Sequence, residues 1–212
     1  MSETRQFDDL PQSEQRLIRH SLEALQREFD GTFDRETIER FVVDSYERIA
    51  AKSKVKKFIG VNAERFARQR LQALARIDSA EPGKPGVLFL CVHNAGRSQM
   101  AAGWLRTIAG EDMNVYTGGS EPGAELNPIV VDAMAEVGVD IREEFPKPWT
   151  DEIVRAVDIV IAMGCGDVCP IYPGKRYVDW DLEDPEGKSL DAVRVIRDEI
   201  KSRVELLVAE FV

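Results

Sequence analysis

The first 80 residues carry apolar side chains at helical spacing. One face of the first predicted helix collects Ile18, Leu22, Leu25 and Phe29. The turn residue Gly31 ends this helix, and Asp34 is a suitable N-cap for a second amphipathic helix. A third begins near Asn62. Because short connections join the three, we expect residues 1–80 to form a three-helix bundle.

A linker rich in proline and glycine follows at residues 81–86. Two prolines and two glycines within it cannot continue a helix. The charge also changes there: residues 1–80 hold 15 basic and 14 acidic side chains, whereas residues 81–212 hold 13 and 24. We therefore place a domain boundary at the linker, with a second domain over residues 87–212.

The pattern of the second domain alternates between strands and helices. The uninterrupted apolar run 87–90 is typical of a strand buried on both faces. Further strands are predicted at 114–117, 158–163 and 176–180. Helices are predicted at 98–109, 128–137 and 150–156, and after the N-cap Ser189. This order predicts an α/β domain with a four-stranded parallel sheet flanked by helices.

A loop with the chemistry of an anion site joins the first of these strands to its helix. It consists of Cys91, Val92, His93, Asn94, Ala95, Gly96, Arg97 and Ser98. Backbone N–H groups at a helix N-terminus bind oxyanions, and the Arg97 guanidinium can hold two oxygens at once. The same positive potential favours the nucleophilic thiolate of Cys91. Ser98 can donate a hydrogen bond to this sulfur while Asn94 braces the loop, although a buried structural cysteine is the simpler alternative.

The segment CVHNAGRSQMA resembles the catalytic loop of the low-molecular-weight tyrosine phosphatase fold, and most of all that of the arsenate reductases built on this fold. The resemblance continues through residues 163–170, 179–188 and 195–200. It covers residues 86–212 and leaves out the first 80. It implies a phosphatase-like domain that reduces arsenate to arsenite.

The resemblance also implies roles for residues outside the loop. Asp184 of the Asp184-Pro185 pair would protonate the departing oxygen. Cys165 and Cys169 lie in a loop interrupted by glycine after the third strand, and such loops face the active site of open α/β sheets. In thioredoxin-coupled arsenate reductases three cysteines act in relay, which would make Cys91 the first, Cys165 the second and Cys169 the third.

Two departures from the family pattern accompany these roles. Three residues separate Cys165 from Cys169, whereas the best-known members have six there. On a continuous helix, two residues at this spacing have a Cα–Cα distance near the upper limit for a disulfide. Gly164 and Gly166 favour local unwinding of such a helix. Gly96 stands where many relatives have a second loop cysteine, which rules out a disulfide within the loop.

Composition limits the location and partners of the chain. The net charge is −10 and residues 81–212 carry −11, so we expect no nucleic acid to bind there. No apolar run is long enough to span a membrane, and the first ten residues lack the core of a signal peptide. We therefore expect a cytoplasmic protein without membrane association. Two distant histidines indicate no metal site. We expect no cofactor either, because thioredoxin would supply the reducing equivalents.

Three alternatives stay open at this point. A tyrosine phosphatase of this fold would carry aromatic residues after the Asp-Pro pair, where this chain has Glu186 and Gly187. An arsenate transferase using a low-molecular-weight thiol would need Cys91 alone. A DNA-binding regulator could use the basic cluster at residues 52–57, although the first 80 residues carry a net charge of only +1.

Overall fold

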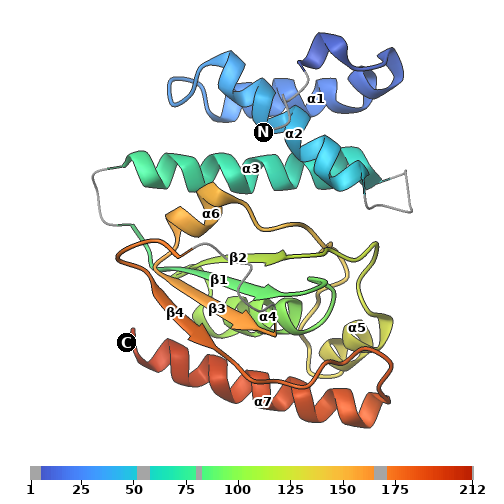
Figure 1. Ribbon diagram of the computed structural model, residues 1–212, viewed down its shortest axis with the longest axis vertical. Coiled ribbons are helices and arrows are strands. Elements are labelled where there is room, and N and C mark those ends of the chain that lie inside the picture. Colours follow the sequence, from blue (N-terminus) through green and yellow to red (C-terminus); the bar gives the residue numbers. More distant parts are fainter. Residues whose placement is uncertain (1–5, 52–57, 80–82, 165–170, 212) are drawn as a thin grey trace. The chain divides into compact units, whose positions relative to one another are not determined.

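The structure is a computed structural model that describes residues 6–51, 58–79, 83–164 and 171–211. The chain divides into two compact units, residues 1–80 and 81–212 (Figure 1). The linker prediction falls at this division, although Gly86, which we assigned to the linker, is the first residue of β1 (Gly86–Cys91). The predicted basic cluster at residues 52–57 lies outside the described residues.

The first unit is helical, as predicted. After a short 3₁₀ turn (Phe7–Asp9) come α1 (Gln12–Glu28), α2 (Arg35–Ala50) and α3 (Ile59–Asp78), each of which packs on the other two. Asp34 caps α2 by accepting a hydrogen bond from the Thr37 amide at 2.7 Å. The third helix begins at Ile59 rather than near Asn62. No side chain caps it, so the sequence gives no start signal there.

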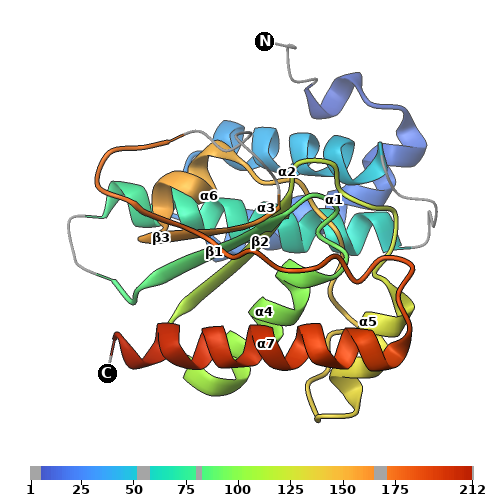
Figure 2. The same cartoon turned by 60° about the horizontal axis from the view of Figure 1, so that its bottom comes forward.

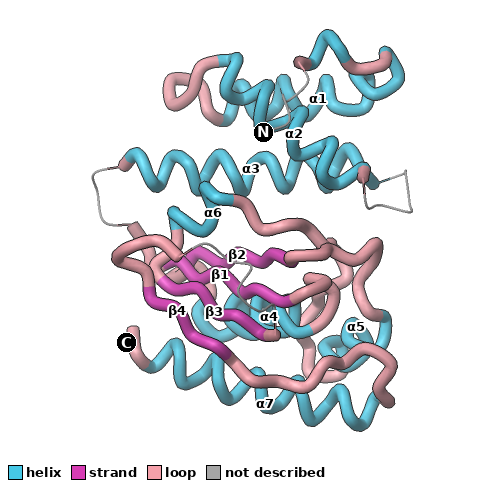
Figure 3. Tube along the Cα trace, viewed as in Figure 1, coloured by secondary structure: helices cyan, strands magenta, loops and turns pink. Residues whose placement is uncertain are grey.

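The second unit contains the predicted four-stranded parallel sheet. Its strands are β1, β2 (Asn114–Gly119), β3 (Ile159–Met163) and β4 (Arg176–Asp179), in the order β2-β1-β3-β4. All three pairings are parallel, and β1 lies between β2 and β3. Along the chain α4 lies between β1 and β2, two helices lie between β2 and β3, and α7 follows β4, while no helix is described between β3 and β4 (Figure 3). The fold class is therefore confirmed.

Helices cover both faces of the sheet. On one face lie α4 (Arg97–Ala109), α5 (Pro128–Ala135) and α7 (Leu190–Ala209), and α6 (Asp151–Ala156) lies against the other (Figures 1 and 2). Every residue of β1 is buried, which explains its uninterrupted apolar run. Ser189 caps α7, as predicted, whereas Phe211 lies beyond the end of that helix and is exposed.

Candidate active site

The anion loop lies between the carboxyl end of β1 and the amino end of α4. Cys91 is the last residue of the strand and Arg97 is the first of the helix. Between them Asn94 has a positive φ of 49°, a conformation that asparagine adopts more readily than most residues. Gly96 is the N-cap of α4 and has no side chain that could cap the helix. The first backbone amides of α4 therefore carry no side-chain cap bond and can bind an anion.

The sulfur of Cys91 is buried and hydrogen-bonded. Cys91 is 3 % exposed, and its Sγ lies 3.0 Å from the Ser98 Oγ and accepts from the Asn94 amide at 3.2 Å. The Asn94 Nδ2 donates to the same Ser98 Oγ at 2.8 Å. The Ser98 hydroxyl can therefore donate to the sulfur while it accepts from Asn94. Two polar partners thus converge on the sulfur of Cys91.

A second layer of buried polar groups holds Asn94 in place. Its Oδ1 accepts from the Lys147 amide at 3.0 Å and from the Gln99 Nε2 at 3.2 Å. Gln99 also donates to the carbonyls of Asn94 and Phe145, at 3.1 and 3.3 Å. Neither Lys147 nor Gln99 was predicted from the sequence. Gln99 lies on a helix whose first nine residues are all buried, so a polar residue there was the available signal.

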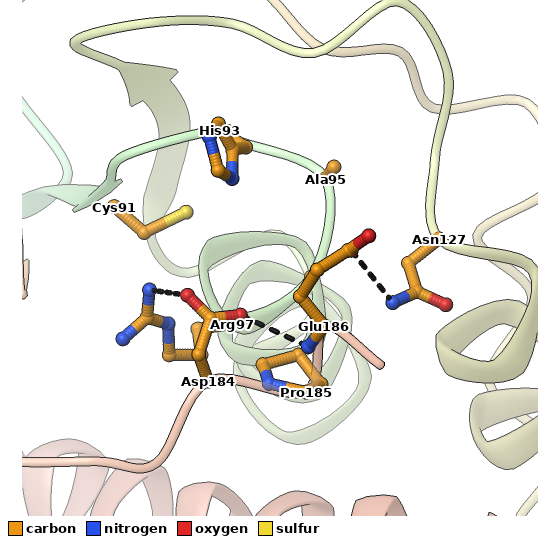
Figure 4. A pocket seen from close by; sticks show the side chains of 9 residues that line it. Cys91, His93, Ala95, Arg97, Asn127, Asp184, Pro185 and Glu186 are labelled. Atoms are coloured by element: carbon orange, nitrogen blue, oxygen red, sulfur yellow. Dashed lines mark hydrogen bonds and ion pairs between the residues drawn. The ribbon is translucent and has the colours of Figure 1, made fainter. Parts of the chain in front are cut away.

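Arg97 and Asp184 meet at the edge of the anion loop. An Nη2 of Arg97 forms an ion pair with the Asp184 Oδ2, and its Nη1 donates to the Leu182 carbonyl at 3.3 Å (Figure 4). The Arg97 side chain is 8 % exposed and that of Asp184 is 45 % exposed. The Asp184 Oδ1 accepts from the Glu186 amide at 3.0 Å. The carboxylate thus occupies a guanidinium face that an oxyanion would need.

The Asp-Pro loop packs closely on the anion loop. A Cβ built on Gly96 would lie 2.7 Å from the Cγ of Pro185, which is shorter than real Cβ contacts allow. Position 96 therefore accepts only glycine while Pro185 holds its place. This contact brings Asp184 to the pocket, a juxtaposition that the sequence suggested only through family resemblance.

A small open pocket lies where these elements converge. Its lining residues are Cys91, His93, Ala95, Gly96, Arg97, Asn127, Asp184, Pro185 and Glu186 (Figure 4). Of the predicted anion-binding residues, Val92, Asn94 and Ser98 are not among this described lining. Asn94 and Ser98 lie buried, where they support Cys91. Asn127 and Glu186 belong to the lining, although neither was predicted from the sequence to take part in the site.

Cys165 and Cys169 lie outside the described residues. The residue before them, Gly164, has a φ of 74°, and a Cβ built on it would lie 3.0 Å from the Arg97 Nη1. Gly164, the last described residue before them, therefore lies beside the Arg97 guanidinium at the edge of the anion site. Within the described ranges, no three His, Cys, Asp or Glu side chains are grouped as a metal site, and no helix could cross a membrane.

Comparisons with known proteins cover both units. The family model described as low molecular weight phosphotyrosine protein phosphatase matches residues 86–211. A model described as protein-tyrosine-phosphatase-like, N-terminal domain matches residues 18–75. An arsenate reductase from Staphylococcus xylosus is 40 % identical over 126 residues, which are 58 % of this chain and 95 % of that protein.

Solved structures agree with these matches. A thioredoxin-dependent arsenate reductase from Corynebacterium glutamicum superposes with a TM-score of 0.82 at 42 % identity, over 92 % of this chain and 96 % of that one. A structure described as an arsenate reductase in the phosphate binding state has a TM-score of 0.52 at 34 % identity, over 59 % of this chain and 98 % of its own. The likeness to the first of these includes the helical unit.

Proposed function

Since the chain belongs to the low molecular weight phosphotyrosine protein phosphatase family, we propose that it uses the anion loop of that family to reduce arsenate to arsenite. The observation that carries this proposal is a cysteine sulfur that accepts from the Asn94 amide and contacts the Ser98 hydroxyl, in a pocket that Arg97 and Asp184 also line. The similarity to arsenate reductases supports arsenate as the oxyanion.

Arsenate binding requires a rearrangement of the resting ion pair. Two oxygens of the bound oxyanion accept hydrogen bonds from the Arg97 guanidinium. The others accept from the backbone N–H groups between Cys91 and Arg97. The Asp184 carboxyl group then loses its cationic partner and faces the bound anion, where it can serve as the proton donor of the first chemical step.

In the first step the Cys91 thiolate attacks arsenic. A sulfur–arsenic bond forms, and one arsenic–oxygen bond breaks as Asp184 transfers its proton to the departing hydroxide, which leaves as water. Arsenic stays in the +5 state in the resulting adduct. Ser98 no longer needs to stabilise a full negative charge once this bond has formed.

In the second step the Cys165 thiolate attacks the sulfur of Cys91. A disulfide forms between these two residues, and the electron pair of the sulfur–arsenic bond stays on arsenic, which leaves as arsenite in the +3 state. Cys169 then attacks Cys165, which forms a Cys165–Cys169 disulfide and frees the Cys91 thiolate. The position of Gly164 beside Arg97 supports the short reach that the first of these attacks requires.

Thioredoxin is the proposed reductant of the final disulfide. A dithiol protein restores both thiols by exchange and becomes oxidised itself, so the enzyme needs no bound cofactor. The thioredoxin dependence of the similar protein from Corynebacterium glutamicum supports this choice. Such a cycle requires a reducing compartment, as the cytoplasm is.

A thiol map after one turnover tests the proposal. Fully reduced protein is mixed with arsenate, alkylated and digested, and the state of each cysteine is determined by mass spectrometry while arsenite is quantified. We expect one arsenite for each chain, alkylated Cys91 and a Cys165–Cys169 disulfide. Cys169→Ser should stop at a Cys91–Cys165 disulfide after releasing its arsenite, and Cys165→Ser should release none.

Other outcomes would identify the alternatives. Three free thiols after arsenate, with activity restored by a small thiol and a glutaredoxin, would make the protein a transferase that uses Cys91 alone. Turnover of phosphotyrosine peptides that is undiminished in Cys165→Ser would make it a phosphatase.

A further inference from the structure

Two side chains meet at the pocket without a part in the steps above. The Nδ2 of Asn127 donates a hydrogen bond of 3.3 Å to the Oε2 of Glu186, and both residues line the pocket (Figure 4). They come from segments 59 positions apart in the sequence. We call this contact the mouth clasp.

Each half of the mouth clasp is fixed to a different wall of the site. The Asn127 amide donates to the Ala95 carbonyl of the anion loop at 3.0 Å, and its Oδ1 caps α5 by accepting from Ile129 at 3.0 Å. The Glu186 amide donates to the Asp184 Oδ1 at 3.0 Å. The mouth clasp therefore ties the anion loop to the loop that carries Asp184.

The position of the mouth clasp matters because it lies beside Asp184, which protonates the leaving oxygen. Asp184 protonates the oxygen that departs, so this oxygen must point toward Asp184. In arsenate the leaving oxygen carries at most a proton. In a phosphate ester it carries the organic group, which must pass the residues beside Asp184 to reach solvent. The backbone amide of Glu186 donates to the Asp184 carboxylate, and the mouth clasp holds the Glu186 side chain at the pocket beside it, where such a group would have to pass.

We propose that the Asn127–Glu186 mouth clasp is a specificity determinant that admits small inorganic oxyanions and excludes phosphate esters. The inference rests on the proposed function, because it needs Asp184 at the leaving oxygen. Charge alone does not explain such selection, since arsenate and phosphate esters are both anions at neutral pH. The discrimination lies in the group attached to the leaving oxygen.

The test compares an aryl ester with arsenate on the same full-length variants. With p-nitrophenyl phosphate, Cys91 attacks phosphorus, the phosphorus–oxygen bond breaks as Asp184 protonates the phenolate, and water then hydrolyses the sulfur–phosphorus bond. The measured quantity is kcat/KM for this ester divided by the second-order rate constant for arsenite release. Glu186→Ala removes one half of the mouth clasp. Asn127→Ser removes the other half and keeps a good N-cap for α5.

Two further variants separate geometry from charge. Glu186→Gln keeps an oxygen that can accept from Asn127 but loses the charge. Glu183→Ala removes a carboxylate from the same loop, one that pairs with Lys188 and does not line the pocket. Glu186→Ala and Asn127→Ser should each raise the ratio about fivefold or more, the effect of losing one hydrogen bond. Glu186→Gln and Glu183→Ala should stay within about twofold of the original protein.

Several results would overturn the inference. The mouth clasp is not the determinant if the ratio stays constant in both Glu186→Ala and Asn127→Ser, if ester turnover is undetectable in every variant, or if Glu183→Ala raises the ratio equally. An equal rise in Glu186→Gln would assign the effect to charge.

Failure of the proposed function has a separate signature. In that case the original protein releases no arsenite from arsenate. The ester rates are then divided by the rate at which iodoacetate alkylates Cys91, and the same comparison among variants still tests the mouth clasp.

Discussion

The hydroxyl of Ser98 is the group best placed to stabilise a thiolate at Cys91. It lies 3.0 Å from the sulfur, and Asn94 fixes its orientation. We expect Ser98→Ala to slow the reaction of Cys91 with arsenate about tenfold, the value of one hydrogen bond to a charged group. Rapid mixing with arsenate at fixed pH and detection of arsenite measures this. The exposed Ser202, which bonds only within α7, provides the control Ser202→Ala, and a matching loss there would contradict the prediction.

Gly96 limits the position of Asp184, the proposed general acid, through its close contact with Pro185. Gly96→Ala places a Cβ against Pro185, so Asp184 must move away from the anion. Because a displacement of about 1 Å costs about a hundredfold in rate, we expect a loss of that order in arsenite release. Gly123→Ala is the matched control, since its Cβ would meet no described atom closer than 3.5 Å. Equal rates for the two variants would show that Pro185 yields without moving Asp184.

At this scale the sequence predicted the residues that the structure brings together within one continuous loop. Cys91, Asn94, Arg97 and Ser98 follow one another closely, so their spacing carries the information. It did not reveal Asn127 or Lys147, whose contacts with the site join segments far apart along the chain. Such contacts depend on side chains meeting backbone groups across the fold, and residue type alone does not encode them.

The helices of the first unit are joined by a partly buried ion pair. The Asp44 carboxylate on α2 accepts from the Arg70 Nη1 on α3 at 2.6 Å, and Arg70 is buried. Burial raises the pKa of Asp44, but the charges and hydrogen bonds of Arg70 and Arg48 outweigh it, so the pKa lies below its usual range. Because the pKa is lowered on folding, this stabilisation is complete above about pH 4 and is lost as the pH falls through the folded value.

Replacing Asp44 should therefore destabilise the helical unit. Asp44→Asn removes the negative charge of Asp44 from the buried Arg70 guanidinium, and we expect a loss of about 2 kcal/mol in the free energy of unfolding at pH 7. The loss should shrink at pH 3. Urea denaturation at both pH values measures it. Asp140→Asn is the control: its exposed pair with Arg142 lowers the pKa of Asp140 to about 2, but solvent screens the pair.

Element boundaries followed local signals where such signals exist. The caps Asp34 and Ser189 were predicted and confirmed, because a short polar side chain at a helix start leaves a clear mark in sequence. The start of α3 has no such cap. The end of α7 at Ala209 has no clear sequence signal either, since Phe211 continues the apolar spacing although it is exposed. Periodicity locates a buried face but does not fix where a helix ends.

The division into two units predicts the result of a truncation. Curated relatives align with 58 % of this chain over 95 % of their own length, and the family model of the second unit matches residues 86–211. We therefore expect residues 81–212 to fold and to release one arsenite per chain at a rate within about threefold of the full chain. Circular dichroism and single-turnover arsenite release test this. An unfolded product would mean that the helical unit contributes to the stability of the second unit.

The resting ion pair between Arg97 and Asp184 makes oxyanion binding a competition between two anions for one guanidinium. Under the proposed function, the contact that arsenate gains with Arg97 is offset in part by the contact that Asp184 loses. Asp184→Asn removes the competing charge. In the Cys91→Ser background, which cannot react, we expect this change to tighten arsenate binding about tenfold, and titration calorimetry measures it. Equal affinities with and without Asp184→Asn would contradict this. The carboxylate that serves the proposed chemical step would thus also limit how firmly the resting site retains an anion.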